Sequence, residues 1–306
     1  MSQELVIQTE NLTKRYGSLA AVNDVSLHVK KGEIYGFLGL NGAGKTTAIR
    51  LLLGLAHPSS GSAFLEGQRI RSGRPGPWNR VGYLVEMPYA YPELSVRENL
   101  QVVAQLRHLR DPQAISRIIQ QLRLDAYQDI KARNLSMGNA QRLGLAKALI
   151  HEPDILILDE PTNGLDPAGI VEVRELLKGL ARERGVTIFI SSHILGEIAK
   201  LASRIGIIHE GRLVQEIDAT ELNTIRQKRL ILEFRDAEKG RKTLQALGFE
   251  VLPGQAGWVI RQEKAIQHPD DLAVALVERD CPPMRLQVAE EDLESYFLRI
   301  ISNKNE

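Results

Sequence analysis

A glycine-rich segment between two apolar stretches has the residue types that bind phosphate. Residues 39–47 read Gly-Leu-Asn-Gly-Ala-Gly-Lys-Thr-Thr, which fits the pattern Gly, any four residues, Gly-Lys-Ser/Thr. The glycines let backbone N–H groups turn toward phosphate oxygens, and a helix that follows adds a favourable dipole. In this pattern Lys45 reaches the β- and γ-phosphates and the Thr46 hydroxyl binds Mg²⁺. The segment predicts nucleoside triphosphate binding; a glycine-rich turn with a solvated lysine is the alternative.

Two carboxylates follow the most apolar run of the chain. Residues 155–158, Ile-Leu-Ile-Leu, predict a strand that is buried on both faces of a parallel sheet. Asp159 and Glu160 come at its carboxyl end, where burial without a cation would be costly, so we expect a bound Mg²⁺. A strand that simply exits into a polar loop is the alternative. Residues 186–190 predict a second buried strand, and His193 follows it, which places this side chain at the same edge of the sheet.

A serine and a glycine next to a helix predict a second phosphate-binding surface. Ser136 and Gly138 precede residues 143–150, which have a helical pattern. Taken alone, Ser136 is only a helix N-cap. Asp166 and Pro167 start another predicted helix, in which the aspartate is an N-cap and the proline takes the first helical position. This capping role is compatible with a functional one.

The elements that must position these residues can be read from the neighbouring pattern. Residues 34–38 predict a strand and residues 47–53 a helix, which is the context that a phosphate-binding loop requires. Residues 5–9 and 25–29 predict two short strands. Tyr16 lies between them, where its ring could stack on a nucleotide base or be an incidental surface aromatic.

Helices dominate the middle of the chain. Residues 95–150 read as all-helical, and Ser95 with Glu98 forms a capping box at their start. Residues 205–209 and 213–217 predict a hairpin. The chain therefore combines a strand-rich frame with a helical insertion.

Composition limits the classes of function. The 306 residues are 43% hydrophobic and 25% charged, as in ordinary globular proteins. A net charge of +1 gives no electrostatic case for nucleic acid as a partner. The single cysteine, Cys281, excludes an internal disulfide and suits a reducing compartment. We see no signal peptide and no apolar run near the ~18 residues of a membrane span, so we expect a cytoplasmic chain.

Over about residues 3–220 the sequence resembles the ATPase subunit of an ABC transporter. Five motifs occur in the family's order: Walker A at 39–47, the signature at 135–139, Walker B at 155–160, the D-loop at 164–166 and the switch histidine, His193. The resemblance implies an α/β fold, a P-loop NTPase ABC cassette with a RecA-like core, an antiparallel β-subdomain and an α-helical subdomain. We place this cassette at residues 1–222, with the helical subdomain at about 95–150.

The resemblance also implies site residues. Tyr16 matches the ring that stacks on adenine, and Glu86 falls at the Q-loop position, where the family normally has glutamine. Glu160 would be the general base, with His193 and Lys45 contacting the reacting phosphate. The implied Mg²⁺ ligands are Thr46, Glu86 and Asp159. The implied ATP-binding residues are Tyr16, Gly39, Asn41, Gly42, Ala43, Gly44, Lys45, Thr46, Thr47, Glu86, Ser136, Gly138 and Asp166.

The family's mechanism implies partners. Two copies of the cassette, which we expect to form a homodimer, enclose two ATP molecules, each between one copy's residues 39–47 and the other copy's Ser136 and Gly138. Hydrolysis then drives export through a transmembrane permease on a separate chain. The subunit would be peripheral on the inner face of the cell membrane. Two residues depart from the family's pattern. One is Glu86 at the Q-loop position, and the other is Asn139, which replaces the glutamine at the end of the signature.

Residues 229–306 lie outside the cassette. Their predicted β-α-β-β-α-β order is that of a small ferredoxin-like α+β domain. A last helix, residues 291–301, would place Leu293, Phe297 and Ile300 on one face. This tail resembles the extension on drug- and antibiotic-exporter ATPases, which suggests a dimer-contact or regulatory module; a stabilising appendage is the alternative.

Two other functions compete with transport. A soluble ABC protein that acts on ribosomes or DNA typically has two cassettes or long coiled-coil insertions, and neither is seen in this sequence. A nucleotide sensor without turnover is disfavoured by the presence of both Glu160 and His193.

Overall fold

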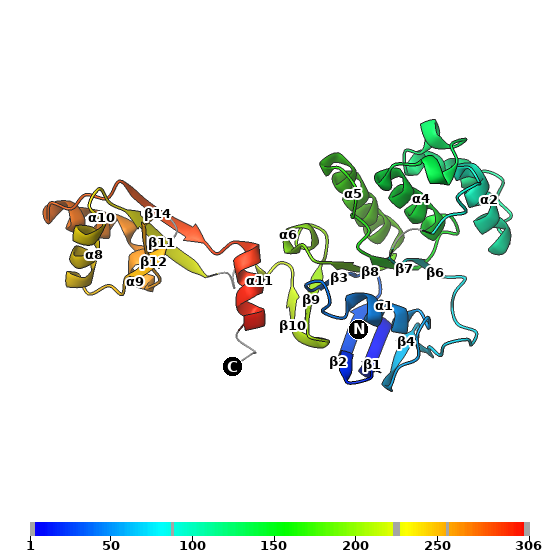
Figure 1. Cartoon of the computed structure of the whole chain (residues 1–306), viewed down its shortest axis with the longest axis horizontal. Coiled ribbons are helices and arrows are strands. Elements are labelled where there is room, and N and C mark those ends of the chain that lie inside the picture. The colour runs from blue at the N-terminus through cyan, green and yellow to red at the C-terminus, as the bar shows by residue number, and fades with distance from the viewer. Residues whose placement is uncertain (1–3, 87–88, 223–226, 255–256, 303–306) are drawn as a thin grey trace. The chain divides into compact units, whose positions relative to one another are not determined.

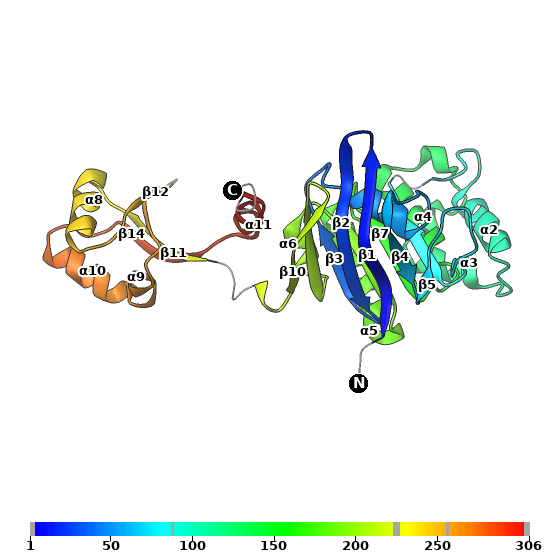
Figure 2. The same ribbon diagram turned by 90° about the horizontal axis from the view of Figure 1, so that it is seen from below.

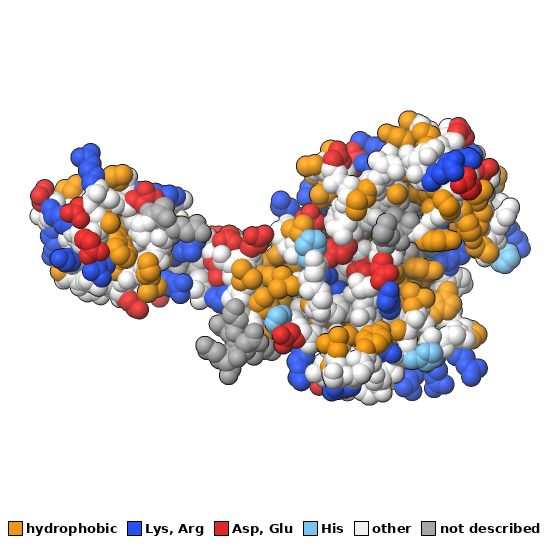
Figure 3. Space-filling view, in the orientation of Figure 1, with side chains coloured by type: hydrophobic (Ala, Val, Ile, Leu, Met, Phe, Trp, Pro, Cys, Tyr) orange, Lys and Arg blue, Asp and Glu red, His pale blue; other side chains and the backbone are white. Residues whose placement is uncertain are grey.

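The computed structural model describes residues 4–86, 89–222, 227–254 and 257–302 (Figure 1). The chain divides into two compact units, Met1–Thr220 and Glu221–Glu306. On the face shown in Figure 3, acidic and basic side chains are interspersed over each unit.

A six-stranded sheet forms the centre of the first unit. Its strands, in chain order, are β3 (Ile34–Leu38), β6 (Val81–Leu84), β7 (Ile155–Asp159), β8 (Thr187–Ser192), β9 (Arg204–His209) and β10 (Arg212–Asp218). Their order across the sheet is β10-β9-β3-β8-β7-β6. All neighbours are parallel except the antiparallel β9–β10 hairpin. Every residue of β3 and β7 is buried, as the continuous apolar runs predict.

A second, antiparallel sheet packs near the first. Its strands are β1 (Leu5–Tyr16), β2 (Leu19–Lys30), β4 (Ser60–Leu65) and β5 (Gln68–Arg69), in the order β2-β1-β4-β5. Figure 2 shows β1 and β2 as a long hairpin. The prediction of two short strands at 5–9 and 25–29 was wrong in length. Both strands extend through polar residues to the turn at Gly17, because their backbones pair along the whole hairpin.

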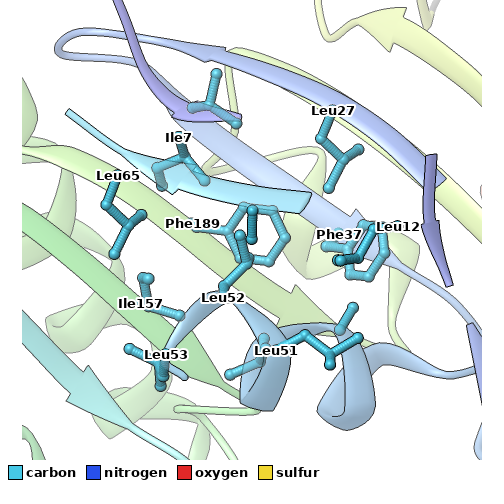
Figure 4. Packing of buried hydrophobic residues seen from close by; sticks show 14 of the residues in the cluster. Ile7, Leu12, Leu27, Phe37, Leu51, Leu52, Leu53, Leu65, Ile157 and Phe189 are labelled. Carbon is cyan, nitrogen blue, oxygen red and sulfur yellow. The ribbon is translucent and has the colours of Figure 1, made fainter. Parts of the chain in front are cut away.

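The core lies between the two sheets and the helix α1 (Lys45–Leu52). Phe37 of β3 and Phe189 of β8 have ring centroids 5.3 Å apart, and both are fully buried. Figure 4 shows them between Ile7 and Leu27 of the antiparallel sheet and Leu52 of α1. Each such buried side chain contributes about 1.5–3 kcal/mol of transfer free energy. This packing fixes α1, and with it the loop that precedes α1, against the sheet.

Three helices cover the opposite face of the central sheet (Figure 1): α4 (Met137–Leu149), α5 (Pro167–Arg184) and the short α6 (Leu195–Ile198). The helices α2 (Val96–Leu106) and α3 (Ala114–Gln121) pack against each other and α4, with two 3₁₀ turns at Asp125–Tyr127 and Ala132–Asn134. The capping box of Ser95 and Glu98 is confirmed. The helix predicted at 143–150 begins earlier, at Met137, because Ser136 caps its backbone.

The second unit has the predicted β-α-β-β-α-β order. Its elements are β11 (Lys228–Glu233), α8 (Ala237–Ala246), β12 (Leu252–Gly254), β13 (Gly257–Ile260), the unpredicted α9 (Glu263–Gln267), α10 (Pro269–Glu278), β14 (Arg285–Glu290) and α11 (Leu293–Ser302). The antiparallel strand order β12-β13-β11-β14 is that of a ferredoxin-like sheet. In α11 the buried side chains are Tyr296, Phe297 and Ile301, whereas Leu293 and Ile300 are only half-buried. The buried face of this helix is therefore rotated from the predicted face, and only Phe297 belongs to both.

Candidate nucleotide-binding site

The phosphate-binding loop connects β3 to α1. Gly42 and Gly44 have φ angles of +82° and +107°, which favour glycine. A Cβ atom on Gly44 would lie 2.2 Å from the carbonyl oxygen of Ala21, so this position also needs the missing side chain. Gly44 is the N-cap of α1 and gives it no side-chain cap. The first N–H groups of the helix therefore face the loop without a capping partner, which is the arrangement that binds anions.

Lys45 is held inside this loop and is only 6% exposed. Its ammonium nitrogen donates to the carbonyl oxygens of Gly39 at 2.7 Å and Leu40 at 3.3 Å. It also lies 3.3 Å from Oε1 of Glu160. The lysine thus joins the loop to the residue that follows β7.

Asp159 ends β7 as a buried carboxylate that accepts two hydroxyl hydrogen bonds. Thr46 Oγ1 donates to Oδ2 at 2.7 Å, and Ser191 Oγ donates to Oδ1 at 2.5 Å. Asp159 is 2% exposed, and within the described ranges no Lys, Arg or His lies within ion-pairing distance of it. A buried negative charge with hydroxyl ligands and no basic partner fits a small divalent cation, since oxygen donors are what Mg²⁺ prefers.

Glu160 is held on both its backbone and its side chain. Its φ angle is +49°, in the left-handed region. The N–H donates to Ser191 Oγ at 3.1 Å and to Ser191 O at 3.3 Å, while the carbonyl oxygen accepts from Gln141 Nε2 at 3.3 Å. Nδ1 of His193 lies 2.8 Å from Oε2. The carboxylate therefore sits between a lysine and a histidine, where it can accept a proton from a bound water.

Tyr16 and Glu86 lie outside this cluster. The Tyr16 ring is 50% exposed, with the ammonium of Lys14 5.0 Å from its centroid. Glu86 is ion-paired with Arg50 of α1. Neither side chain makes a hydrogen bond or ion pair with Thr46 or Asp159 in the described structure.

The signature and D-loop residues form a separate group. Ser136 Oγ accepts from the N–H of Asn139 at 3.3 Å, and Asp166 Oδ1 accepts from the N–H of Gly169 at 2.9 Å. A Cβ atom on Gly138 would lie 3.2 Å from the carbonyl oxygen of Gly164, so the two segments touch. Among the described residues this group makes no hydrogen bond or ion pair with Lys45, Thr46 or Asp159. Asn41 is exposed in the phosphate-binding loop, and Thr47 is half-buried in the first turn of α1.

Sequence reasoning missed Ser191 and Gln141. Ser191 is fully buried, and Gln141 is 4% exposed. Their signal was weak: a serine two residues before His193, and a glutamine two residues after the signature. Only the pairing of β7 with β8, in which Asp159 lies opposite Ser191, brings that hydroxyl to the site.

The fold and the site together define a P-loop nucleoside triphosphatase: a glycine loop and α1 follow the central parallel strand β3, and the buried Asp159 ends the apolar strand β7, which β8 separates from β3 in the sheet. A family model described as ABC transporter matches residues 22–163. The chain belongs to this family as an ATP-binding subunit, an ATPase.

Similar proteins cover most of the chain. The bacitracin transport ATP-binding protein BcrA of Bacillus licheniformis is 41% identical over 97% of both chains. The lantibiotic transport ATP-binding protein SrtF of Streptococcus pyogenes is 39% identical over 71% of this chain and 93% of its own. A solved ATP-binding subunit of an ABC transporter has a TM-score of 0.65 and 28% identity over 72% of this chain and 92% of its own. In the described parts of the chain, no helix is long and apolar enough to span a bilayer.

Proposed function

We propose that this chain hydrolyses Mg²⁺-bound ATP to power export of an antimicrobial of the kind named for its relatives, bacitracin or a lantibiotic, through a permease on a separate chain. The observation that carries the catalytic part is the position of Glu160, whose carboxylate lies 3.3 Å from Lys45 and 2.8 Å from His193. The substrate class rests on the relatives BcrA and SrtF.

The chain's own residues divide the chemistry between them. Thr46 and Asp159 would hold Mg²⁺, whose charge would offset the negative charge that develops on the phosphate oxygens. Lys45 and the first N–H groups of α1 bind the β- and γ-phosphates. Glu160 accepts a proton from the attacking water, and His193 orients the Glu160 carboxylate and contacts the γ-phosphate. Catalysis is then positioning plus electrostatic stabilisation.

A second copy of the chain completes the site. Ser136, Gly138 and Asp166 form their own group without polar contact to Lys45, which supports the idea that they act on nucleotide bound to the other copy of a homodimer. Ser136 and Gly138 lie at the N-terminus of α4, which favours an anion. Tyr16 offers an exposed ring on which the adenine base stacks.

A groove lined in part by Glu86 is the proposed docking site for the membrane partner. The cavity has a volume of about 510 Å³, and its lining includes Tyr89, Tyr91, Leu106 and Lys147. Tyr89 is 74% exposed and Leu106 is 72% exposed, which is typical of interaction surfaces. Burial lowers the pKa of Lys147. Docking here would hold the subunit at the inner face of the membrane.

A single preparation of the protein tests both the proposed ATP hydrolysis and the proposed membrane partner. The full chain is purified from membranes, the polypeptide that accompanies it is identified, and Mg²⁺-dependent phosphate release from ATP is measured. We expect a polytopic membrane partner and ATPase activity that needs both nucleotide and metal. Lack of hydrolysis by the complex would overturn the enzymatic part, and unchanged bacitracin and lantibiotic tolerance after loss of the chain would overturn the substrate class.

A further inference from the structure

The hydroxyl of Ser191 links the two acidic residues of the site. It donates to Oδ1 of Asp159 at 2.5 Å and accepts from the N–H of Glu160 at 3.1 Å. A serine hydroxyl has a single proton, and here that proton is committed to Asp159. Both bonds are therefore directional, and one small group fixes the orientation of a carboxylate and of the next peptide.

The fold leaves Ser191 little freedom to make other contacts. The residue is fully buried and pairs with Asp159 in the parallel register of β7 and β8. Side chains alternate between the faces of a strand, so Ser191 points to the same face as Phe189, which packs in the core. Ser192 points to the opposite face, and its hydroxyl accepts from the N–H of Ile194 at 3.0 Å.

Asp159 depends on this contact for its orientation. Its other oxygen, Oδ2, accepts from the Thr46 hydroxyl at 2.7 Å. With Ser191 on one oxygen and Thr46 on the other, the carboxylate plane is fixed and Oδ2 is kept on the side of the phosphate-binding loop. Loss of the Ser191 donor leaves Oδ1 buried and unpaired, which favours rotation of the carboxylate away from Thr46.

Glu160 depends on the same hydroxyl for its backbone. A glutamate with φ +49° is in a conformation that residues with a side chain adopt at a cost, so surrounding contacts must hold it. The Ser191 hydroxyl is the nearer of the two acceptors of the Glu160 N–H; the Ser191 carbonyl lies at 3.3 Å. The backbone in turn aims the Glu160 carboxylate between Lys45 and His193.

We propose that Ser191 is a positioning residue for ATP hydrolysis: its hydroxyl orients Asp159 for Mg²⁺ and Glu160 for the attacking water. This inference rests on the proposed roles of Asp159 and Glu160. It assigns no contact between Ser191 and the nucleotide, so its effect must pass through the two acids.

Three variants of the full chain test this role. For Ser191→Ala we expect kcat for ATP to fall about 10–100-fold, with KM for ATP within about two-fold of wild type. We also expect the half-saturating Mg²⁺ concentration to rise at least about three-fold, since loss of such a partner typically weakens metal sites. Ser191→Thr keeps the hydroxyl and suits a strand, and should recover most of both losses. Ser192→Ala removes the neighbouring hydroxyl from the opposite face and should match wild type.

The outcomes separate this inference from the proposed function. Wild-type kcat and Mg²⁺ dependence in a folded Ser191→Ala protein would overturn the positioning role and leave the ATPase assignment intact. Equal losses of kcat in Ser191→Ala and Ser191→Thr, or a similar loss in Ser192→Ala, would indicate a packing effect. Either result would also overturn the positioning role. Thermal unfolding of each variant shows whether it has folded. A wild-type chain without ATPase activity would overturn the proposed function and this inference together.

Discussion

The ammonium nitrogen of Lys45 lies 3.3 Å from a carboxylate oxygen of Glu160, although the two residues are far apart in the sequence. The other acceptors of Lys45 are the backbone carbonyls of Gly39 and Leu40. A phosphate oxygen that binds Lys45 must therefore compete with the Glu160 carboxylate. Removing that charge should favour nucleotide binding while it removes the proposed base.

Glu160→Gln should separate binding from turnover. We expect kcat to fall about 10²–10⁴-fold, the range for a lost general base, while ATP affinity is kept or increased. Steady-state phosphate release and nucleotide binding measure the two effects, and size-exclusion chromatography with ATP should show a dimer that persists. Glu210→Gln, in the exposed turn of the β9–β10 hairpin, is the control. A Glu160→Gln variant that hydrolyses ATP near the wild-type rate would contradict the assignment.

Asp159→Asn should weaken the use of Mg²⁺. The neutral amide offers one acceptor oxygen to the two hydroxyl donors and removes the buried charge that attracts the cation. We expect the half-saturating Mg²⁺ concentration to rise at least about ten-fold. Titration of ATPase activity with Mg²⁺ measures this. Asp154→Asn, just before the same strand, changes an exposed partner of Arg80 and should leave the titration unchanged.

Glu86→Gln should retain ATPase activity. The carboxylate is half-exposed and paired with Arg50, and an exposed pair of this kind is worth about 0–1 kcal/mol. Rates within about three-fold of wild type are expected for Glu86→Gln and for Arg50→Gln alike. A sharply raised Mg²⁺ requirement in Glu86→Gln alone would instead support the expected metal-ligand role of this residue.

The parts of the site that could be predicted are those determined by short stretches of chain. The glycine loop, the buried strand before Asp159 and the capping box at Ser95 each depend on residues within one turn or one strand. Local spacing sets such geometry, so the sequence alone located them. The order of strands and helices predicted for the second unit likewise indicated the ferredoxin-like sheet that the structure has.

The parts that could not be predicted depend on which distant residues meet. The contact of Ser191 with Asp159 follows from the register between β7 and β8, which no local pattern encodes. The pairing of Glu86 with Arg50 depends on how α1 lies beside the end of β6. The length of β1 was underestimated because its last residues are polar, and its pairing with β2, not apolar alternation, keeps them extended.

Tyr16→Ala should raise KM for ATP. Stacking of a base on an aromatic ring contributes about 1–3 kcal/mol, so we expect a rise of roughly 5–150-fold with kcat at saturating ATP little changed. Tyr16→Phe keeps the ring and should behave as wild type. Tyr127→Ala removes a partly exposed ring from the helical region as a control. An equal KM in the wild type and Tyr16→Ala would exclude stacking on this ring.

His151 should make the stability of the cassette depend on pH. Its Nε2 lies 3.1 Å from the carbonyl oxygen of Val81, which also accepts from Arg107 at 3.2 Å, while Nδ1 is buried and has no hydrogen-bond partner in the described structure. Burial, and next the positive charge of Arg107, lower the pKa of His151 from 6.5 to about 4. The unfolded chain therefore binds a proton more readily than the folded one.

The sign of the effect follows from this difference. Stability should be full above about pH 6.5 and fall as the pH drops toward about 4, below which the loss levels off. Because the ring is partly solvated, we expect a loss on the order of 1–2 kcal/mol in the free energy of unfolding. Urea denaturation of wild type and His151→Gln across this range measures it, and the glutamine variant should have a flatter profile. His57→Gln, at an exposed position, should retain the wild-type slope, and an unchanged slope in His151→Gln would exclude His151 as its source.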